Sequence, residues 1–215
     1  MRKLMGVSLL ALGLVMVAGG ASAQEAFQTK QAGDWLVRGR VTGVVPTDGG
    51  NVENRTTGVD TGLDVNDITN SAIPELDFSY FFTKNIAAEL ILGTTHHKVH
   101  ASTGVDMGGV WLLPPTLTVQ YHPLPDSRFS PYVGAGVNYT IFYGEKDVSL
   151  TGLKVHNSFG LALQAGVDYA VSGPWSVNLD VKKIFLRPEA VTSTLRVDNV
   201  KIDPWLVSVG VGYRF

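Results

Sequence analysis

The sequence predicts an all-β fold, an eight-stranded antiparallel transmembrane β-barrel with short periplasmic turns and long extracellular loops. Three observations carry this prediction. Apolar residues alternate with small or polar ones in eight segments, the segments have nearly uniform length, and the links between them are alternately short and long.

The composition excludes several other classes of protein. The 215 residues are 45% hydrophobic but only 17% charged, and 24 of them are glycine, which disfavours a helical enzyme. With no cysteine, the chain has neither a disulfide scaffold nor a thiolate site. A net charge of −2 and a pI near 6.2 argue against nucleic-acid binding through a basic surface.

The N-terminal segment is expected to be a secretory signal. Arg2 and Lys3 precede an apolar run over residues 4–18, and Ala21 and Ala23 form a small-residue cleavage site. A transmembrane anchor is the alternative, but the run is short for a span. We therefore expect residues 1–23 to be a signal peptide cleaved near Ala23, and residues 24–215 to form the barrel domain. No later stretch has 18 consecutive apolar residues, so strands would have to cross any membrane.

The eight predicted strands each run for 11 to 14 residues. Strands of soluble proteins are usually about 5–6 residues long, whereas a tilted membrane strand needs about 9–11. The lengths therefore favour a bilayer. In chain order, the predicted strands are 35–45, 72–82, 86–97, 111–122, 130–143, 158–171, 175–187 and 205–215.

The chemistry of the two faces indicates which side meets lipid. One face of nearly every strand is continuously apolar and ends in aromatic residues such as Trp35, Tyr143 and Trp175. Aromatic residues at strand ends are typical of the interfacial girdles of membrane barrels. The opposite face is small or polar with charges of both signs, which would pair inside a narrow lumen. A soluble sandwich, with its apolar face inward, is the less favoured alternative.

The links alternate strictly in length, as expected for an outer-membrane barrel. Short links cover residues 83–85, 123–129 and 172–174, and long ones cover 46–71, 98–110, 144–157 and 188–203. Both termini are then expected on the periplasmic side.

The C-terminal end resembles the assembly signal of outer-membrane barrels, with Tyr213 followed by a terminal Phe215. Beyond this class, the chain resembles the OmpW family of small outer-membrane proteins. The resemblance rests on residues 33–40, 132–140, 158–169, 175–182 and 210–215 taken as an ordered set. It implies a barrel whose outer half encloses a hydrophobic passage, closed toward the periplasm by polar residues. It also implies uptake of small hydrophobic molecules, released sideways into the membrane.

The inward positions change chemistry along the barrel. Near the short turns we expect a polar plug, and toward the long loops an apolar channel lining; simple filling of a narrow core is the alternative. The predicted plug residues are Arg38, Asp77, Asp168, Asp180 and Arg214. The predicted lining residues are Val44, Leu112, Pro114, Phe142, Ile184, Leu186 and Leu206.

No catalytic, metal or cofactor site is predicted. His96 and His97 would face opposite sides of a strand, and His156 and Ser158 lack an identifiable activating carboxylate. The predicted function is a passive channel for small hydrophobic molecules; the alternative is a non-conducting barrel for adhesion or envelope stability. Expected partners are outer-membrane lipids, lipopolysaccharide, hydrophobic solutes and the barrel-assembly machinery, but no nucleic acid. We expect a monomer in the outer membrane of a Gram-negative bacterium.

Overall fold

The computed structural model describes most of the chain beyond the predicted signal peptide, which lies outside the described residues together with its cleavage site. No helix in the described part is long and apolar enough to cross a membrane. The described residues are 27–47, 51–54, 57, 60–68, 70–101, 106–147, 154–187, 190–191, 195–197 and 202–215.

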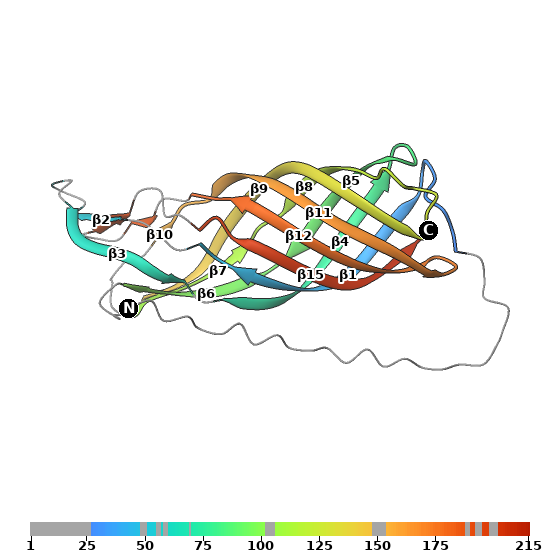
Figure 1. Ribbon diagram of the computed structural model, residues 1–215. Helices are drawn as coiled ribbons and strands as arrows, with labels where there is room; N and C mark the ends of the chain where they lie inside the picture. The colour runs from blue at the N-terminus through green and yellow to red at the C-terminus, as the bar shows by residue number, and fades with distance from the viewer. Residues whose placement is uncertain are drawn as a thin grey trace, which may run out of the picture.

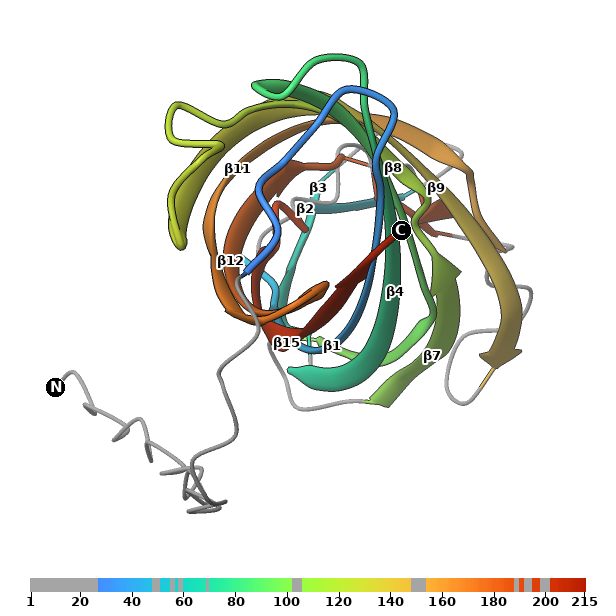
Figure 2. The ribbon, with the colours of Figure 1, turned by 90° about the vertical axis from the view of Figure 1, so that its right-hand side faces the viewer.

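Eight strands form a closed antiparallel barrel (Figure 2). Each strand pairs with its neighbours along the chain, and the last pairs with the first, Val41 opposite Val209, so the sheet has no free edge at this level. The predicted eight-stranded antiparallel barrel is confirmed. Its strands are β1 (Trp35–Val45), β4 (Ser71–Phe81), β5 (Ile86–Gly93), β8 (Thr116–Tyr121), β9 (Phe129–Asp147), β11 (Ser158–Ser172), β12 (Trp175–Phe185) and β15 (Trp205–Arg214).

The strands place apolar side chains outside and polar ones inside. In β12, every odd-numbered residue from Trp175 to Val181 is exposed, and every even-numbered residue from Ser176 to Lys182 is buried. This follows from the two-residue period of a strand, which sends alternate side chains to opposite faces. This arrangement is the reverse of a soluble protein's core, since Leu161 is 63% exposed and Arg38 is fully buried. It suits a barrel surrounded by lipid.

Two of the predicted strands are interrupted. The backbone leaves the strand conformation at Thr94 and again at Pro114 and Pro115. Proline has no N–H to donate to the ladder, which explains the second break. The predicted strand 86–97 therefore divides into β5 and β6 (Thr95–Ala101), and the predicted strand 111–122 into β7 (Asp106–Leu113) and β8.

The long links contain strands of their own, which the sequence reading did not predict. They pair in the order β10-β13-β14-β2-β3-β6-β7-β9 and extend the sheet beyond the barrel at the end opposite the C-terminus (Figure 1). β2 pairs with β3 and β13 with β14 inside single links, whereas the β14–β2 and β10–β13 pairings join different links. These strands are β2 (Asn51–Asn54), β3 (Asp60–Ile68), β10 (Lys154–Val155), β13 (Ala190–Val191) and β14 (Leu195–Val197).

Glycine allows the sheet to coil tightly enough to close. At Gly136 in β9, a Cβ atom would lie 2.0 Å from the backbone oxygen of Leu117 in β8. Backbone atoms cannot yield as the end of a side chain can, so any larger residue would push the two strands apart. At Gly39 in β1, by contrast, a Cβ would meet nothing within 4 Å.

We therefore predict that Gly136→Ala destabilises the folded barrel by about 1–3 kcal/mol, the usual cost of overpacking. Gly39→Ala is the matched control and should have little effect. The measurement is the fraction of refolded protein that migrates as the compact form on an unheated denaturing gel, as urea is increased. Equal midpoints for the two variants would contradict the steric argument.

Candidate functional site

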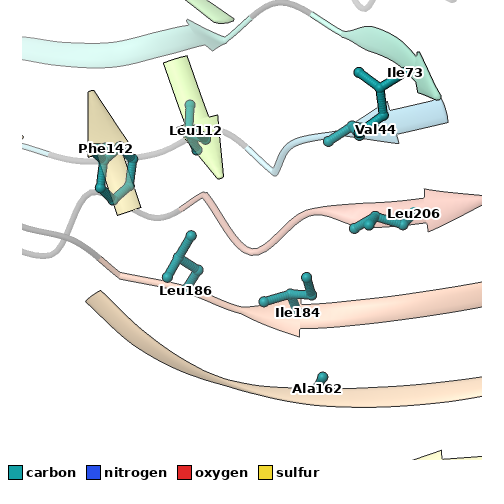
Figure 3. Packing of buried hydrophobic residues seen from close by; sticks show 8 residues of the cluster. All are labelled: Val44, Ile73, Leu112, Phe142, Ala162, Ile184, Leu186 and Leu206. Carbon is teal, nitrogen blue, oxygen red and sulfur yellow. The ribbon is translucent and has the colours of Figure 1, made fainter. Parts of the chain in front are cut away.

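An apolar pocket occupies the half of the lumen next to the long links. Its side chains come from different strands of the barrel and point toward one another (Figure 3). The enclosed cavity has a volume of about 40 Å³. Space of this size holds on the order of one or a few water molecules, so a larger solute must displace lining side chains. The buried cluster consists of Val44, Ile73, Leu112, Phe142, Ala162, Ile184, Leu186 and Leu206.

The predicted lining residues lie in this region. Six of the seven belong to the buried cluster, and Pro114 lines the cavity beside them. The sequence reading missed Ile73, Ile91 and Ile202. The first two share the inward phase of Glu75 and Glu89, so the period-two pattern could have found them. Ile202 lies outside the predicted strands and carries no such signal.

Beneath the pocket, Arg38 is the centre of a buried ion network. Its Nε and Nη2 donate to the two carboxylate oxygens of Asp168 at 3.0 and 2.9 Å. Its Nη1 donates to Asp77 Oδ1 at 3.0 Å and to Ser79 Oγ at 2.9 Å. Glu89 Oε1 lies 3.4 Å from the same nitrogen. The planar guanidinium thus links three strands through one side chain.

Arg40 forms a second layer, one inward position along β1. Its Nε donates to Glu75 Oε1 at 2.8 Å. Its Nη2 lies 3.0 Å from Asp77 Oδ2, an ion contact whose angles do not make a hydrogen bond. The carboxylate of Asp77 therefore lies between two arginines, which compensates for its complete burial.

Tyr132 extends the network across the lumen. Its hydroxyl donates to Asp180 Oδ2 at 2.8 Å and accepts from Asn178 Nδ2 at 3.1 Å. Asn178 also donates to Asp168 Oδ1 at 2.9 Å. The ring has room because Gly166 faces it, where a Cβ would lie 2.4 Å from the Tyr132 hydroxyl oxygen. The sequence reading did not assign Tyr132 to the lumen.

Four of the five predicted plug residues meet in this network. Arg38 contacts both Asp77 and Asp168, and Asp180 joins through Tyr132. Arg214 lies apart, with its Nη1 donating to Gln28 O at 2.8 Å. The network also includes four residues that share the inward phase of the predicted plug residues: Arg40, Glu75, Glu89 and Lys182.

A strap formed by residues 27–34 crosses the short-turn end of the barrel. Its backbone bonds to the turns, from Gln28 N to Gly173 O at 3.1 Å and from Lys30 N to Pro125 O at 3.2 Å. The Lys30 ammonium enters the lumen, donates to Ser130 Oγ at 2.6 Å and lies 3.3 Å from Asp168. Burial lowers the pKa of Lys30 to about 8, opposed by the attraction of Asp168, so the side chain is still largely cationic at neutral pH. Strap and network together close this end.

The arrangement is suited to exclusion and apolar contact. No group of His, Asp or Glu side chains among the described residues could hold a metal ion. The ion network fills the lumen with paired charges, which resists the passage of ions and apolar solutes alike. The pocket above it provides an apolar surface in the half of the lumen next to the long links.

Replacement of Arg38 by Met should destabilise the barrel by about 3–5 kcal/mol, because it leaves buried carboxylates without their cation. Lys84→Met is the control, since its ion pair with Asp126 is exposed and worth at most about 1 kcal/mol. Urea titration of both variants refolded in detergent, followed by gel migration, measures the difference. A similar small effect for both would mean that the network contributes little to stability.

The comparisons with known proteins agree with this architecture. An uncharacterised outer-membrane protein of Sinorhizobium fredii is 46% identical to the chain, over 95% of this chain and 94% of the relative. Outer membrane protein W of Escherichia coli is 35% identical, over 93% of this chain and 94% of the relative.

Among solved structures, the chain is similar to the outer membrane protein OprG of Pseudomonas aeruginosa. The two superimpose with a TM-score of 0.81 at 28% identity, covering 88% of this chain and 99% of that one. The sequence pattern of the OmpW family matches residues 31–215, nearly the whole described part of the chain. The chain therefore belongs to the OmpW family and is a protein of the Gram-negative outer membrane.

Proposed function

We propose that this protein is a passive channel for small hydrophobic molecules. They enter the barrel from its long-loop end and leave sideways through the wall into the membrane. The OmpW family is a non-enzymatic family, which is consistent with a transport role. The single observation that carries the proposal is the stacking of an apolar pocket directly on a closed ion network. A solute that enters from the long-loop end finds apolar contacts and then a barrier.

The barrier makes a straight exit unfavourable. An apolar molecule that moved on toward the short turns would have to separate Arg38 from Asp77 and Asp168, and buried charges without partners are costly. The strap closes the same end a second time through Lys30. The lower free-energy route for an apolar solute is therefore through the wall into the hydrocarbon of the bilayer.

The wall has a gap in its hydrogen-bond ladder next to the pocket. Pairing of β4 with β5 ends at Glu75 opposite Gly93, and the next pairing on this side begins at Ile68 of β3 opposite Val99 of β6. Pro74 lies in the stretch of β4 that pairs with β1 but not with β5, and it has no N–H to donate. We infer that this gap is the lateral exit.

Gly93 supports this location because it lies at the last β4–β5 pair and has no side chain between the pocket and the gap. It lines the pocket and is partly exposed. A Cβ at Gly93 would lie 3.4 Å from Ile73 Cδ1 and 3.5 Å from Pro74 O, which is ordinary contact, so a side chain can be added there without a backbone clash.

The partners follow from the location. Membrane lipids surround the exposed apolar belt, as they do in any outer-membrane barrel. We further propose that lipopolysaccharide contacts the outer rim, that the assembly machinery recognises Tyr213 and Phe215, that the signal peptide is cleaved near Ala23, and that the protein is a monomer.

Replacing both Leu112 and Leu206 by Asp should reduce n-octane uptake to the level of cells without the protein. An apolar solute in the pocket would have to displace the water around two carboxylates, which is costly. The control is the double replacement by Met, which preserves apolar volume and should retain uptake. Both variants are first shown to be folded by gel migration. Equal uptake by cells with the wild type, with either variant and without the protein would contradict the channel proposal and favour an adhesion or envelope-stability role.

Gly93→Phe should reduce the rate of octane delivery several-fold, since the ring would pack beside Ile73 and Pro74 at the inferred exit and obstruct it. Gly39→Phe adds the same ring to an open, lipid-facing position of β1 and is the matched control. Initial rates of uptake are compared at equal amounts of folded protein. An unchanged rate for Gly93→Phe would place the exit elsewhere in the barrel.

A further inference from the structure

The boundary between the pocket and the ion network contains polar side chains that line the apolar space. Lys182 and Glu75 both line the pocket, although each is almost completely buried. Each lies one inward position below an apolar pocket residue of its own strand, Ile184 in β12 and Ile73 in β4. They therefore form the floor on which a solute would rest.

The ammonium group of Lys182 has unused hydrogen-bond donors. Its side chain is 2% exposed, and its nearest carboxylate oxygens, on Glu89 and Asp180, are both 3.7 Å from Nζ. These are ion contacts beyond hydrogen-bond distance, and the described residues provide no closer acceptor for its three N–H groups. A buried ammonium without hydrogen bonds is costly. An acceptor on a bound molecule would relieve that cost.

Glu75 supplies the complementary acceptor. Both of its contacts with Arg40, the hydrogen bond to Nε and the ion pair to Nη2, fall on Oε1. Within the described part of the chain, Oε2 is thus left to accept a proton from a ligand. The threonine hydroxyls of the floor differ in this respect, since Thr116 donates to Pro114 O and Thr140 donates to Asn138 Oδ1. The floor therefore offers one strong donor and one strong acceptor.

The charges of the network indicate which head group fits. The connected side chains comprise five carboxylates, Glu75, Asp77, Glu89, Asp168 and Asp180, and four cations, Arg38, Arg40, Lys182 and Lys30. An anionic head would add to an existing excess of negative charge. A neutral hydroxyl avoids this, because its oxygen accepts from Lys182 and its proton is donated to Glu75.

We propose that the pocket selects amphipathic alcohols, in which an apolar body fills the space among Val44, Ile184 and Leu206 and a terminal hydroxyl binds Lys182 and Glu75. Lys182 is on this view the specificity-determining residue of the pocket. The inference rests on the proposed function, since it concerns the same pocket. It goes further by naming the substrate class: alcohols are preferred over alkanes of equal length and over the corresponding carboxylates.

The test compares protein-dependent uptake of 1-octanol, n-octane and octanoate by cells that produce the wild type, Lys182→Met or Lys182→Arg. Loss of a hydrogen bond to a charged group corresponds to about a tenfold change. We therefore expect the octanol-to-octane uptake ratio to fall about tenfold in Lys182→Met and to be largely restored in Lys182→Arg. Because both solutes are measured on the same cells, the ratio reports specificity independently of how much folded protein each variant yields.

A second measurement on the wild type does not depend on a variant that folds. 1-Octanol should inhibit uptake of labelled octane at about tenfold lower concentration than 1-chlorooctane, which has a similar apolar body but no hydroxyl proton. Equal inhibition, an unchanged ratio in Lys182→Met, or preferred uptake of octanoate would each overturn the inference while the channel stands. Octane uptake independent of the protein would instead overturn the proposed function.

Discussion

The pairing of Arg38 with its carboxylates is the interaction on which the rest of the structure depends. A barrel of eight strands leaves an interior only wide enough for side chains, and lipid outside requires the polar ones to be inside. Charges in that interior are tolerated only in pairs. Arg38 satisfies this requirement for Asp77, Asp168 and Glu89 at once. The same contacts that make the interior stable also close it, so stability and exclusion have one physical origin.

Because the lumen is closed, the breaks in the hydrogen-bond ladder of the wall decide where a solute can leave the pocket. A regular eight-stranded sheet would seal the apolar pocket on all sides except the top. Pro74, the break at Thr94, and Pro114 with Pro115 interrupt hydrogen bonding at the level of the pocket and not at the level of the ion network. Missing ladder bonds lower the cost of separating two strands. The wall is therefore weakest where the bilayer and the pocket are nearest, and strongest around the buried charges.

The floor of the pocket joins the two halves chemically. Below it Arg38 and Arg40 are paired with buried carboxylates; above it the lining is mostly apolar. Lys182 and Glu75 belong to both environments, held by the network from beneath and facing the pocket above. A wholly apolar solute would leave the Lys182 ammonium and Glu75 Oε2 without hydrogen bonds, whereas an alcohol would supply them. The pocket thus has an apolar lining and a polar floor, which match the apolar body and the hydroxyl of an alcohol.

The period-two pattern by itself determined the barrel, its inversion and most of the site, because side-chain direction in a strand depends only on position parity. It placed Val44 and Leu206 in the apolar half and Arg38 and Asp168 in the polar half before any pairing was known. What parity cannot supply is contact across the lumen. Tyr132 joins Asp180, Lys30 reaches Asp168 from outside any strand, and Arg214 turns away to the strap. The strands within the long links were likewise beyond sequence reading. The contacts of Tyr132, Lys30 and Arg214 depend on register and closure, which bring together residues between 48 and 186 positions apart, and so only the tertiary structure decided them.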